Sequence, residues 1–416
     1  MLSRRALLAS AALLPTVAHA RPAPTAPPIV APPGDEDFWM GIQGAFTLDR
    51  TVVNLNNGGC SPSPRVVHEA LKRYLDISNQ APVHYMWNTL EPQLESVRRE
   101  LAKEAGCDPE SLAITRNSSE ALQIAQLGID LAPGDEVVVT DQDYPRMLDT
   151  WDQRAAREGV VVKRISFPVP LRGAQSLIDA YAAAVTDRTR VLHVSHAVFL
   201  SGQILPVREV CAWARARGLV TIVDGAHAFA HMPYRIDELD CDYYGVSLHK
   251  WLMAPVGTGF LYVRKDRIAG HWGLQPTGVA LKANIRKFEE IGTHPAAMHN
   301  AIAEAISFHR GIGITRKHAR LYRLRRYWSD AIAGDARVHF HTPDDPAASG
   351  AIGVFSIDGM DPAAVTSALW ARWRILATPI VHPAVTGVRV TPSVYTTFSE
   401  LDTFVAAVNT LLSELR

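Results

Sequence analysis

The chain has little cysteine, four residues in 416, and Cys60, Cys107, Cys211 and Cys241 form no CxxC pair. The spacing therefore indicates neither a zinc site nor a redox dithiol, and we predict no metal. It leaves disulfides open, with scattered free thiols as the simpler interpretation. An excess of one charge is also absent, because Lys+Arg and Asp+Glu number 42 each. This balance does not indicate binding to nucleic acid or to a charged membrane surface.

Apolar runs long enough to span a bilayer are missing as well. At the N-terminus, Arg4-Arg5 precedes a short apolar run, residues 6–15, and Ala18-His19-Ala20 forms a small-x-small cleavage site. Paired arginines at this place predict a twin-arginine signal over residues 1–20, with an ordinary secretory signal as the alternative. We therefore expect a periplasmic or secreted protein, carried in folded form by the twin-arginine export machinery and free of the membrane once the signal is removed.

Composition divides the remaining chain. Six prolines predict a stiff linker over residues 21–33, and residues 34–53 form an N-terminal segment. With 47% hydrophobic residues, the chain can bury a large core. We expect a large domain over 54–295 and a small C-terminal domain over 296–416.

Strands and helices alternate through the large domain, which predicts a parallel sheet with helices on both faces. The expected strands include 136–140, 160–165, 190–194 and 220–224, and the expected helices 117–128 and 146–158. Further along, the pattern predicts a long amphipathic helix over 295–311 and a basic helix over 315–333. We expect the basic run 320–326 to be a solvated helix face.

One stretch organises the chemistry. An apolar run ends in Asp224-Gly225-Ala226-His227, Ser247-Leu248-His249-Lys250-Trp251 follows, and another strand comes at 257–263. This reads as a buried strand that ends in a carboxylate, then a loop that carries a lysine. In open α/β sheets, ligands bind beyond the carboxyl ends of strands, where Asp224 falls.

An aspartate and a lysine so placed suit pyridoxal phosphate (PLP). Lys250 would form a Schiff base with the cofactor aldehyde and then move the substrate α-proton, while Asp224 would keep the pyridine nitrogen protonated. Ser247 and His249 flank the lysine and could donate to the phosphate. Each motif alone is weak, since strands often end in Asp-Gly for turn reasons.

Together these segments, with Gly257-Thr258-Gly259-Phe260-Leu261-Tyr262, resemble the class V aminotransferase family. These are PLP enzymes of fold type I and include cysteine desulfurases and isopenicillin N epimerase-like proteins. The resemblance implies an α/β fold with a large, mostly parallel seven-stranded sheet and a small α+β C-terminal domain. It also implies an amino-acid-like small-molecule substrate and a homodimer with shared active sites.

The helix after the strand at 111–115 begins with Asn117-Ser118-Ser119-Glu120, a capping-box pattern. Free amides at a helix N-terminus bind phosphate, and the hydroxyls of Ser118 and Ser119 add donors. Plain helix capping explains the same residues. The resemblance places the family's phosphate-binding turn here, although Asn117 replaces the usual glycine.

Other positions favour the epimerase-like branch of the family. Tyr144 follows a predicted strand, and its ring could stack on the pyridine where desulfurases carry histidine, with a packed core tyrosine as the alternative. His227 stands where desulfurases tend to have glutamine and could orient Asp224 or touch the ring. Phe199 replaces the asparagine that bonds the cofactor hydroxyl in desulfurases, so His196 becomes a candidate for that role, with a structural residue that bridges loop amides as the equal alternative.

The resemblance also implies residues for the substrate and the neighbouring subunit. Asn57 and Gly58 would lie at the mouth of the site, and Arg389 would bind the substrate α-carboxylate in a bidentate fork. Thr293, in a Glu-x-Gly-Thr-like loop, would reach the phosphate in the partner subunit. The structural alternative is a simple turn for the segment of Asn57 and Gly58, and a surface ion pair at the strand edge for Arg389.

Desulfurases of this family carry a nucleophilic cysteine on a loop before the strand of Arg389. Residues 378–385 contain none here, and no cysteine follows Cys241. An exported class V aminotransferase or epimerase-like enzyme is therefore expected, a description that also fits the exported enzymes that tailor pyoverdine siderophores. A PLP-dependent β-lyase is the alternative enzyme, and a PLP-fold binding module is the alternative without activity.

Overall fold

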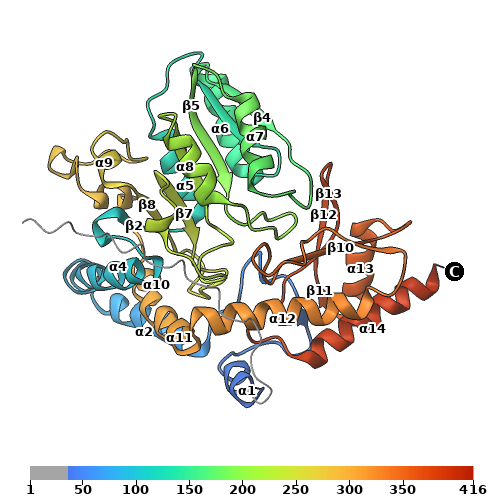
Figure 1. Cartoon of the computed structure of the whole chain (residues 1–416). Coiled ribbons are helices and arrows are strands. Elements are labelled where there is room, and N and C mark those ends of the chain that lie inside the picture. Colours follow the sequence, from blue (N-terminus) through green and yellow to red (C-terminus); the bar gives the residue numbers. More distant parts are fainter. Residues whose placement is uncertain (1–35, 416) are drawn as a thin grey trace, which may run out of the picture. The chain divides into compact units, whose positions relative to one another are not determined.

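The computed structural model describes residues 36–415. The predicted signal over residues 1–20 and the linker over 21–33 lie outside the described residues. A seven-stranded sheet forms the centre of the larger part (Figure 1). Its strands, in spatial order, are β2 (Leu112–Thr115), β8 (Gly259–Val263), β7 (Tyr243–Ser247), β6 (Val220–Asp224), β5 (Thr189–Ser195), β3 (Glu136–Thr140) and β4 (Val161–Ile165). β8 runs in the direction opposite to the other six strands, so the predicted mostly parallel sheet of seven strands is confirmed.

Helices cover both faces of this sheet. On one face, α5 (Ser118–Leu127) and α6 (Pro145–Glu158) pack on Val137 and Val139. On the other, α7 (Ala174–Ala184) and α8 (Val207–Arg215) belong to the core that contains Val138. All three valines are fully buried, because successive side chains of a strand point to opposite faces and both faces here are dry.

The C-terminal part contains an antiparallel four-stranded sheet. Its order is β12 (Thr378–His382), β13 (Val385–Val390), β10 (Gly353–Ile357) and β9 (Val338–Phe340). Three helices share one hydrophobic core with it: α12 (Ile314–Ile332), α13 (Pro362–Trp373) and α14 (Phe398–Glu414). β1 (Val53–Asn54) and β11 (Ile375–Leu376) form a separate two-stranded parallel pair. This pair joins an N-terminal segment to the chain just before β12.

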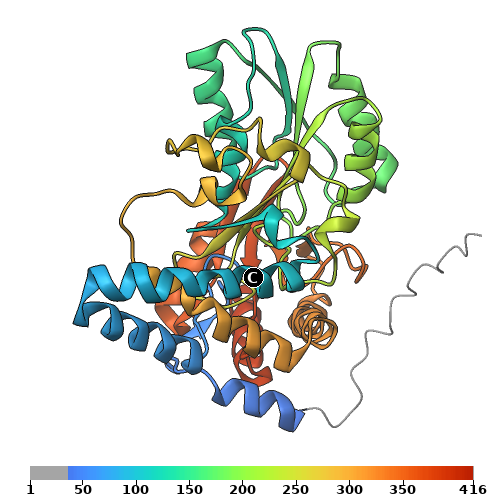
Figure 2. The same ribbon diagram turned by 90° about the vertical axis from the view of Figure 1, so that its left-hand side faces the viewer.

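The remaining α-helices and a π-helical turn lie outside the two main sheets. They are α1 (Glu36–Gly44), α2 (Arg65–Gln80), α3 (Pro82–Tyr85), a π-helical turn (Met86–Leu90), α4 (Glu91–Ala105), α9 (Lys265–Ile268), α10 (Ala296–Asn300) and α11 (Ile302–Ile312). Among them, α1 pairs with α12 through Glu36. Both α10 and α11 contact α2 and α4, which lie in front in Figure 2. The single helix predicted over 295–311 is therefore wrong, since the chain breaks at Ala301 between α10 and α11.

The basic run in α12 also differs from expectation. Arg320 and Arg325 are each only 2% exposed. Arg320 lies over the rings of Trp39 and Phe398 and pairs with Glu36, while Arg325 donates to the Gly350 carbonyl. Their long stems cover apolar surface while each guanidinium finds an acceptor or a ring. This face of α12 is thus packed rather than solvated.

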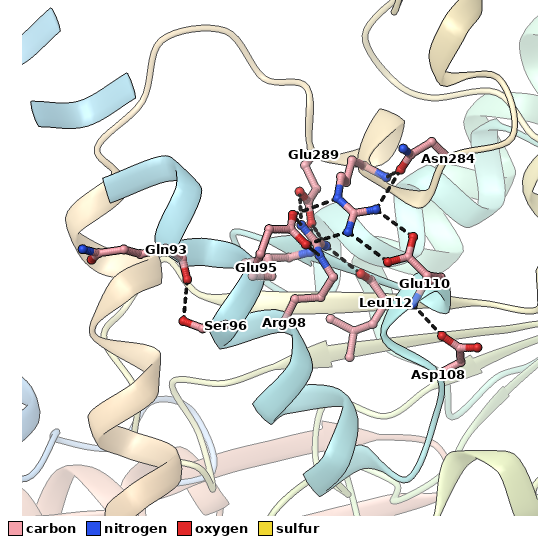
Figure 3. A network of polar contacts seen from close by, with 11 residues as sticks. Gln93, Glu95, Ser96, Arg98, Asp108, Glu110, Leu112, Asn284 and Glu289 are labelled. Carbon is pink, nitrogen blue, oxygen red and sulfur yellow. Dashed lines mark hydrogen bonds and ion pairs between the residues drawn. The ribbon is translucent and has the colours of Figure 1, made fainter. Parts of the chain in front are cut away.

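A polar network fixes the segment that leads to Thr293 (Figure 3). Arg98, 1% exposed on α4, donates to both carboxylate oxygens of Glu289 and to the Leu112 carbonyl. Glu289 also accepts from the Ile114 amide of β2. Arg286 bridges Glu95 and Glu110 with bonds of 2.6–3.0 Å. The network joins α4, β2 and residues 284–289.

The structure also describes the helices and the cysteines that the sequence analysis considered. No helix among residues 36–415 is long and apolar enough to cross a membrane. All four cysteines are free thiols, Cys60 exposed and Cys211 and Cys241 buried.

Candidate active site

The predicted site residues gather at the carboxyl ends of the parallel strands, around a cavity of about 420 Å³. Those that line it are Ser118, Ser119, Tyr144, Asp224, His227, Ser247, His249, Lys250 and Arg389. They come from both sheets and from loops far apart in the sequence. The fold therefore brings together nearly the whole set predicted from the motifs.

The turn before α5 is built as the sequence suggests. The Asn117 side chain accepts from the Glu120 amide at 2.9 Å, so helix capping is confirmed. The Ser118 amide donates to Ser247 Oγ at 2.9 Å, and Ser247 Oγ donates to Ser118 Oγ at 2.8 Å. A Cβ on Gly259 would lie 2.6 Å from the Asn117 Cα. Only glycine at 259 lets β8 approach this turn so closely.

Lys250 lines the cavity and contacts His227. Its Nζ lies 3.1 Å from His227 Nε2. Burial lowers the pKa of Lys250 to about 8, and burial together with the nearby Lys250 charge holds the pKa of His227 well below its usual range. His227 is therefore neutral at pH 7, and its Nε2 accepts a hydrogen bond from the amine.

Asp224 ends β6 at the floor of the cavity and is 7% exposed. Burial raises its pKa, while a hydrogen bond from the Ala226 amide at 2.9 Å and the nearby charge of Lys250 act in the opposite direction. Its other oxygen stays available to a donor in the cavity. Below it, His193 of β5 is fully buried and contributes to its electrostatic surroundings.

Two aromatic residues, Tyr144 and Phe199, also line the cavity. Tyr144, 38% exposed, packs edge-on against Phe199 with ring centroids 5.3 Å apart. Phe199 also presents its carbonyl to Arg389. His196 does not line the cavity, because its Nδ1 pairs with the Tyr244 hydroxyl at 2.7 Å under the sheet end. Its candidacy for the cofactor hydroxyl has no support in this geometry.

Arg389 stands on β13 and is 7% exposed. Its terminal nitrogens donate to the Phe199 carbonyl at 2.9 Å and to Asn56 Oδ1 at 3.4 Å. Its Nε is buried without a partner among the described residues. Burial lowers the pKa of the guanidinium to about 10, so it remains charged at neutral pH and suits an anionic ligand.

Two of the predicted site residues, Asn57 and Thr293, do not line this cavity. Asn57 is fully buried, and its amide donates to the carbonyls of Asn54 and Thr391, so it holds the turn while its neighbour Gly58 lines the cavity. The substrate role predicted for Asn57 is not compatible with this packing. Thr293 is exposed and lines a different cavity, beside Arg98. Because its predicted role is toward a partner subunit, it stays a prediction.

The sequence analysis missed two polar residues that line the cavity, Ser195 and Thr378, and the buried Asp143 that holds Ser195. Asp143, 1% exposed, accepts from the Thr140 amide at 2.8 Å and from Ser195 Oγ at 2.7 Å, and Ser195 lines the cavity. Burial raises the pKa of Asp143 to about 6. Thr378 of β12 lines the cavity beside Arg389. Segment 378–382 was expected to be a loop, because it contains Pro379 and lacks the alternation of apolar and polar residues that is typical of a strand.

The residues fit PLP. His227 Nδ1, His249 Nδ1 and Arg389 Nε are buried atoms without partners in the part of the chain described, and all belong to cavity-lining residues. An acid, an amine and a serine-rich helix start face the same space, and these are the groups that a pyridine nitrogen, an aldehyde and a phosphate require.

The site and the fold together are those of a PLP enzyme. The model of the aminotransferase class-V family matches residues 53–393. The chain belongs to this family. Its cofactor is pyridoxal phosphate.

Among curated proteins, this chain is similar to isopenicillin N epimerases over most of its length and to a cysteine desulfurase over a shorter part. Isopenicillin N epimerase of Amycolatopsis lactamdurans is 32% identical, over 90% of this chain and 98% of that protein. The epimerase of Streptomyces clavuligerus is 31% identical, over 90% and 99%. A probable cysteine desulfurase of Halobacterium salinarum is 29% identical, over 76% and 79%.

Solved structures support the fold. A cysteine desulfurase from Thermococcus onnurineus has a TM-score of 0.79 at 22% identity, covering 90% of this chain and 98% of that one. A C-DES mutant with glycine covalently linked to its PLP cofactor has a TM-score of 0.78 at 23% identity, covering 86% and 98%. The predicted PLP fold type I is thus confirmed.

Proposed function

We propose that this chain is an epimerase-like PLP enzyme, or an aminotransferase of the same branch, that moves the α-proton of an amino-acid-like compound. The observation that carries the proposal is the placement of Lys250, Asp224 and Arg389 around one cavity of about 420 Å³. A base, a buried acid and a carboxylate-binding cation are what such a substrate requires. The full-length similarity to isopenicillin N epimerases supports the epimerase-like branch.

When bound, PLP supplies an aldehyde that links to an amine and a ring that withdraws electrons from the α-carbon. Lys250 holds or moves the proton at Nζ, and its pKa of about 8 leaves part of the amine unprotonated near neutral pH. His227 Nε2 accepts from that amine and orients it. Asp224 would hold the ring nitrogen through a carboxylate oxygen, and Arg389 would bind and orient the substrate carboxylate.

A desulfurase mechanism has less support. A desulfurase needs a thiolate that can reach the substrate sulfur. In place of a cysteine loop, β12 and β13 form a hydrogen-bonded hairpin in which Thr378, Pro379 and Ile380 line the cavity.

The test is exchange of the α-proton. PLP-loaded protein is incubated in deuterated water with L-amino acids and with short peptides that have a free N-terminal amine. Mass spectrometry detects deuterium in the products, and chiral separation detects inversion. We expect Lys250-dependent deuterium incorporation. Inversion identifies an epimerase, transfer to a 2-oxo acid an aminotransferase, and release of ammonia or sulfide a β-lyase. Absence of exchange with every compound, with the cofactor spectrum unchanged, would contradict the proposal and favour a binding module.

We also propose that the protein is exported and acts as a homodimer. Arg4-Arg5 before the short apolar run supports twin-arginine export, and replacement of both by lysine should retain active protein in the cytoplasm. Unchanged export would favour a general secretory signal. Thr293, exposed in its own chain, supports a dimer in which this loop reaches the partner's phosphate site. Analytical ultracentrifugation tests that state, and a monomer with full activity would contradict it.

A further inference from the structure

Thr378 and Arg389 form a pair across the hairpin that closes the cavity. In the antiparallel ladder of β12 and β13, Thr378 lies directly opposite Arg389. Residues opposite each other in such a ladder project to the same face, with Cβ atoms about 4.5–5.5 Å apart. Both residues line the cavity that contains Lys250. The hydroxyl and the guanidinium thus enter the site side by side.

Each of the two carries a donor without a protein acceptor. Thr378 Oγ1 is buried and has no hydrogen-bond partner among the described residues, and the same holds for Arg389 Nε. Buried polar groups are nearly always satisfied in folded proteins. The other end of Arg389 is fixed by the Phe199 carbonyl and Asn56, so its Nε cannot turn to find another partner without breaking those bonds.

A carboxylate matches this arrangement. It accepts only, through two oxygens, and a hydroxyl next to a guanidinium can donate to one oxygen while the guanidinium donates to the other. An apolar or cationic group would leave both donors unsatisfied.

We propose that Thr378 Oγ1 is a second donor to the substrate carboxylate that Arg389 Nε binds. The proposal rests on the function proposed above and adds a binding residue that contributes to carboxylate recognition. The pair favours a free carboxylate over an amide, because a hydrogen bond from the Thr378 hydroxyl to a charged oxygen is stronger than one that it makes with a neutral amide, and because Arg389 adds its charge.

The test compares L-alanine with L-alaninamide. Both probes have the same amine and the same small methyl side chain, so they differ only in the carboxylate or amide that would contact Thr378 and Arg389. Binding to PLP-loaded protein is followed by the change in cofactor absorbance. Thr378→Val, which keeps the shape and removes the hydroxyl, should weaken L-alanine binding about 10- to 100-fold and L-alaninamide binding clearly less, because a hydrogen bond to a charged group contributes more than a neutral one. Thr378→Ser, the matched control, should bind L-alanine like the wild type.

The outcomes separate the two proposals. Arg389→Gln should weaken L-alanine binding at least as much as Thr378→Val. If Arg389→Gln weakens binding and Thr378→Val does not, or if Thr378→Val weakens both probes equally, the role of Thr378 is wrong and the proposed function stands. If the wild-type spectrum responds to neither probe, or Arg389→Gln changes nothing, the carboxylate site itself is wrong.

Discussion

Lys250 Nζ and His227 Nε2 lie 3.1 Å apart inside the cavity, although 23 residues separate them in the chain. The first residue stands on the loop after β7 and the second on the turn after β6, two adjacent parallel strands. A neutral histidine beside a lysine whose pKa is about 8 is an acceptor that stabilises the ammonium form without adding charge. The pair thus sets how much unprotonated amine the site holds.

Removing this acceptor should lower the pKa of Lys250. A hydrogen bond to a charged group stabilises it by about 1.5–3 kcal/mol, which corresponds to about one to two pH units. In cofactor-free protein, the rate of PLP capture should reach half its maximum near pH 8 and shift to about pH 6–7 in His227→Phe. His227→Gln, which retains an acceptor oxygen, is the control. A shift to higher pH would show that His227 is charged, contrary to this account.

Lys317 gives a second pH dependence. It is 1% exposed, donates to the Trp251 carbonyl next to Lys250, and has a pKa lowered by burial to about 7. The unfolded chain holds this proton up to about pH 10.4 and the folded chain only up to about 7, so this group makes wild-type stability rise with pH between those values. Lys317→Met abolishes that slope.

The stability of Lys317→Met relative to the wild type should therefore be about 4 kcal/mol more favourable at pH 6 than at pH 10. Urea denaturation at the two pH values measures this difference. Lys103→Met, on the exposed side of α4, is the control and should keep the wild-type slope. Equal slopes in wild type and Lys317→Met would show that Lys317 is charged across the range.

The network of Figure 3 predicts a destabilised variant. Arg98→Ala leaves Glu289, whose side chain is only 20% exposed, without its buried partner. Loss of one member of such a pair costs about 3 kcal/mol. Arg286→Ala removes the more exposed member, side chain 28% exposed, and should cost about 1 kcal/mol. Chemical denaturation tests the order, and equal losses would contradict it.

Cys60 should not form a persulfide. Its Sγ lies 3.9 Å from the His249 carbonyl, and although the residue as a whole is exposed, partial burial of the thiol raises its pKa despite the nearby Lys250 charge. The thiol form therefore prevails at neutral pH, and its reactivity is low. Mass spectrometry after L-cysteine treatment should find the unmodified mass at this position. A persulfide on Cys60, lost with activity in Cys60→Ala, would show that the enzyme works as a desulfurase.

The sequence predicted the large sheet and most of the site because both depend on local patterns. Apolar runs marked β3, β5 and β6, which are buried on both faces, and Asp224 and Lys250 stand in short motifs at strand ends. Placement at the carboxyl ends of parallel strands then brings such residues together.

What the sequence did not predict depends on contacts between distant segments. Asn57 looks like a site residue, but its amide pairs with Thr391, 334 residues away, and no local pattern reveals that. Thr378 joins the site only because β12 pairs with β13 in one register. The break at Ala301 and the burial of Arg320 likewise depend on neighbouring helices rather than on periodicity.

The central claim is that Lys250 is the residue that holds PLP. The direct measurement is borohydride reduction of the PLP-loaded protein, followed by proteolysis and mass mapping of the pyridoxyl label. We predict a single labelled lysine, Lys250, and loss of both the label and α-proton exchange in Lys250→Ala. A label on any other lysine, with exchange retained in Lys250→Ala, would contradict the account.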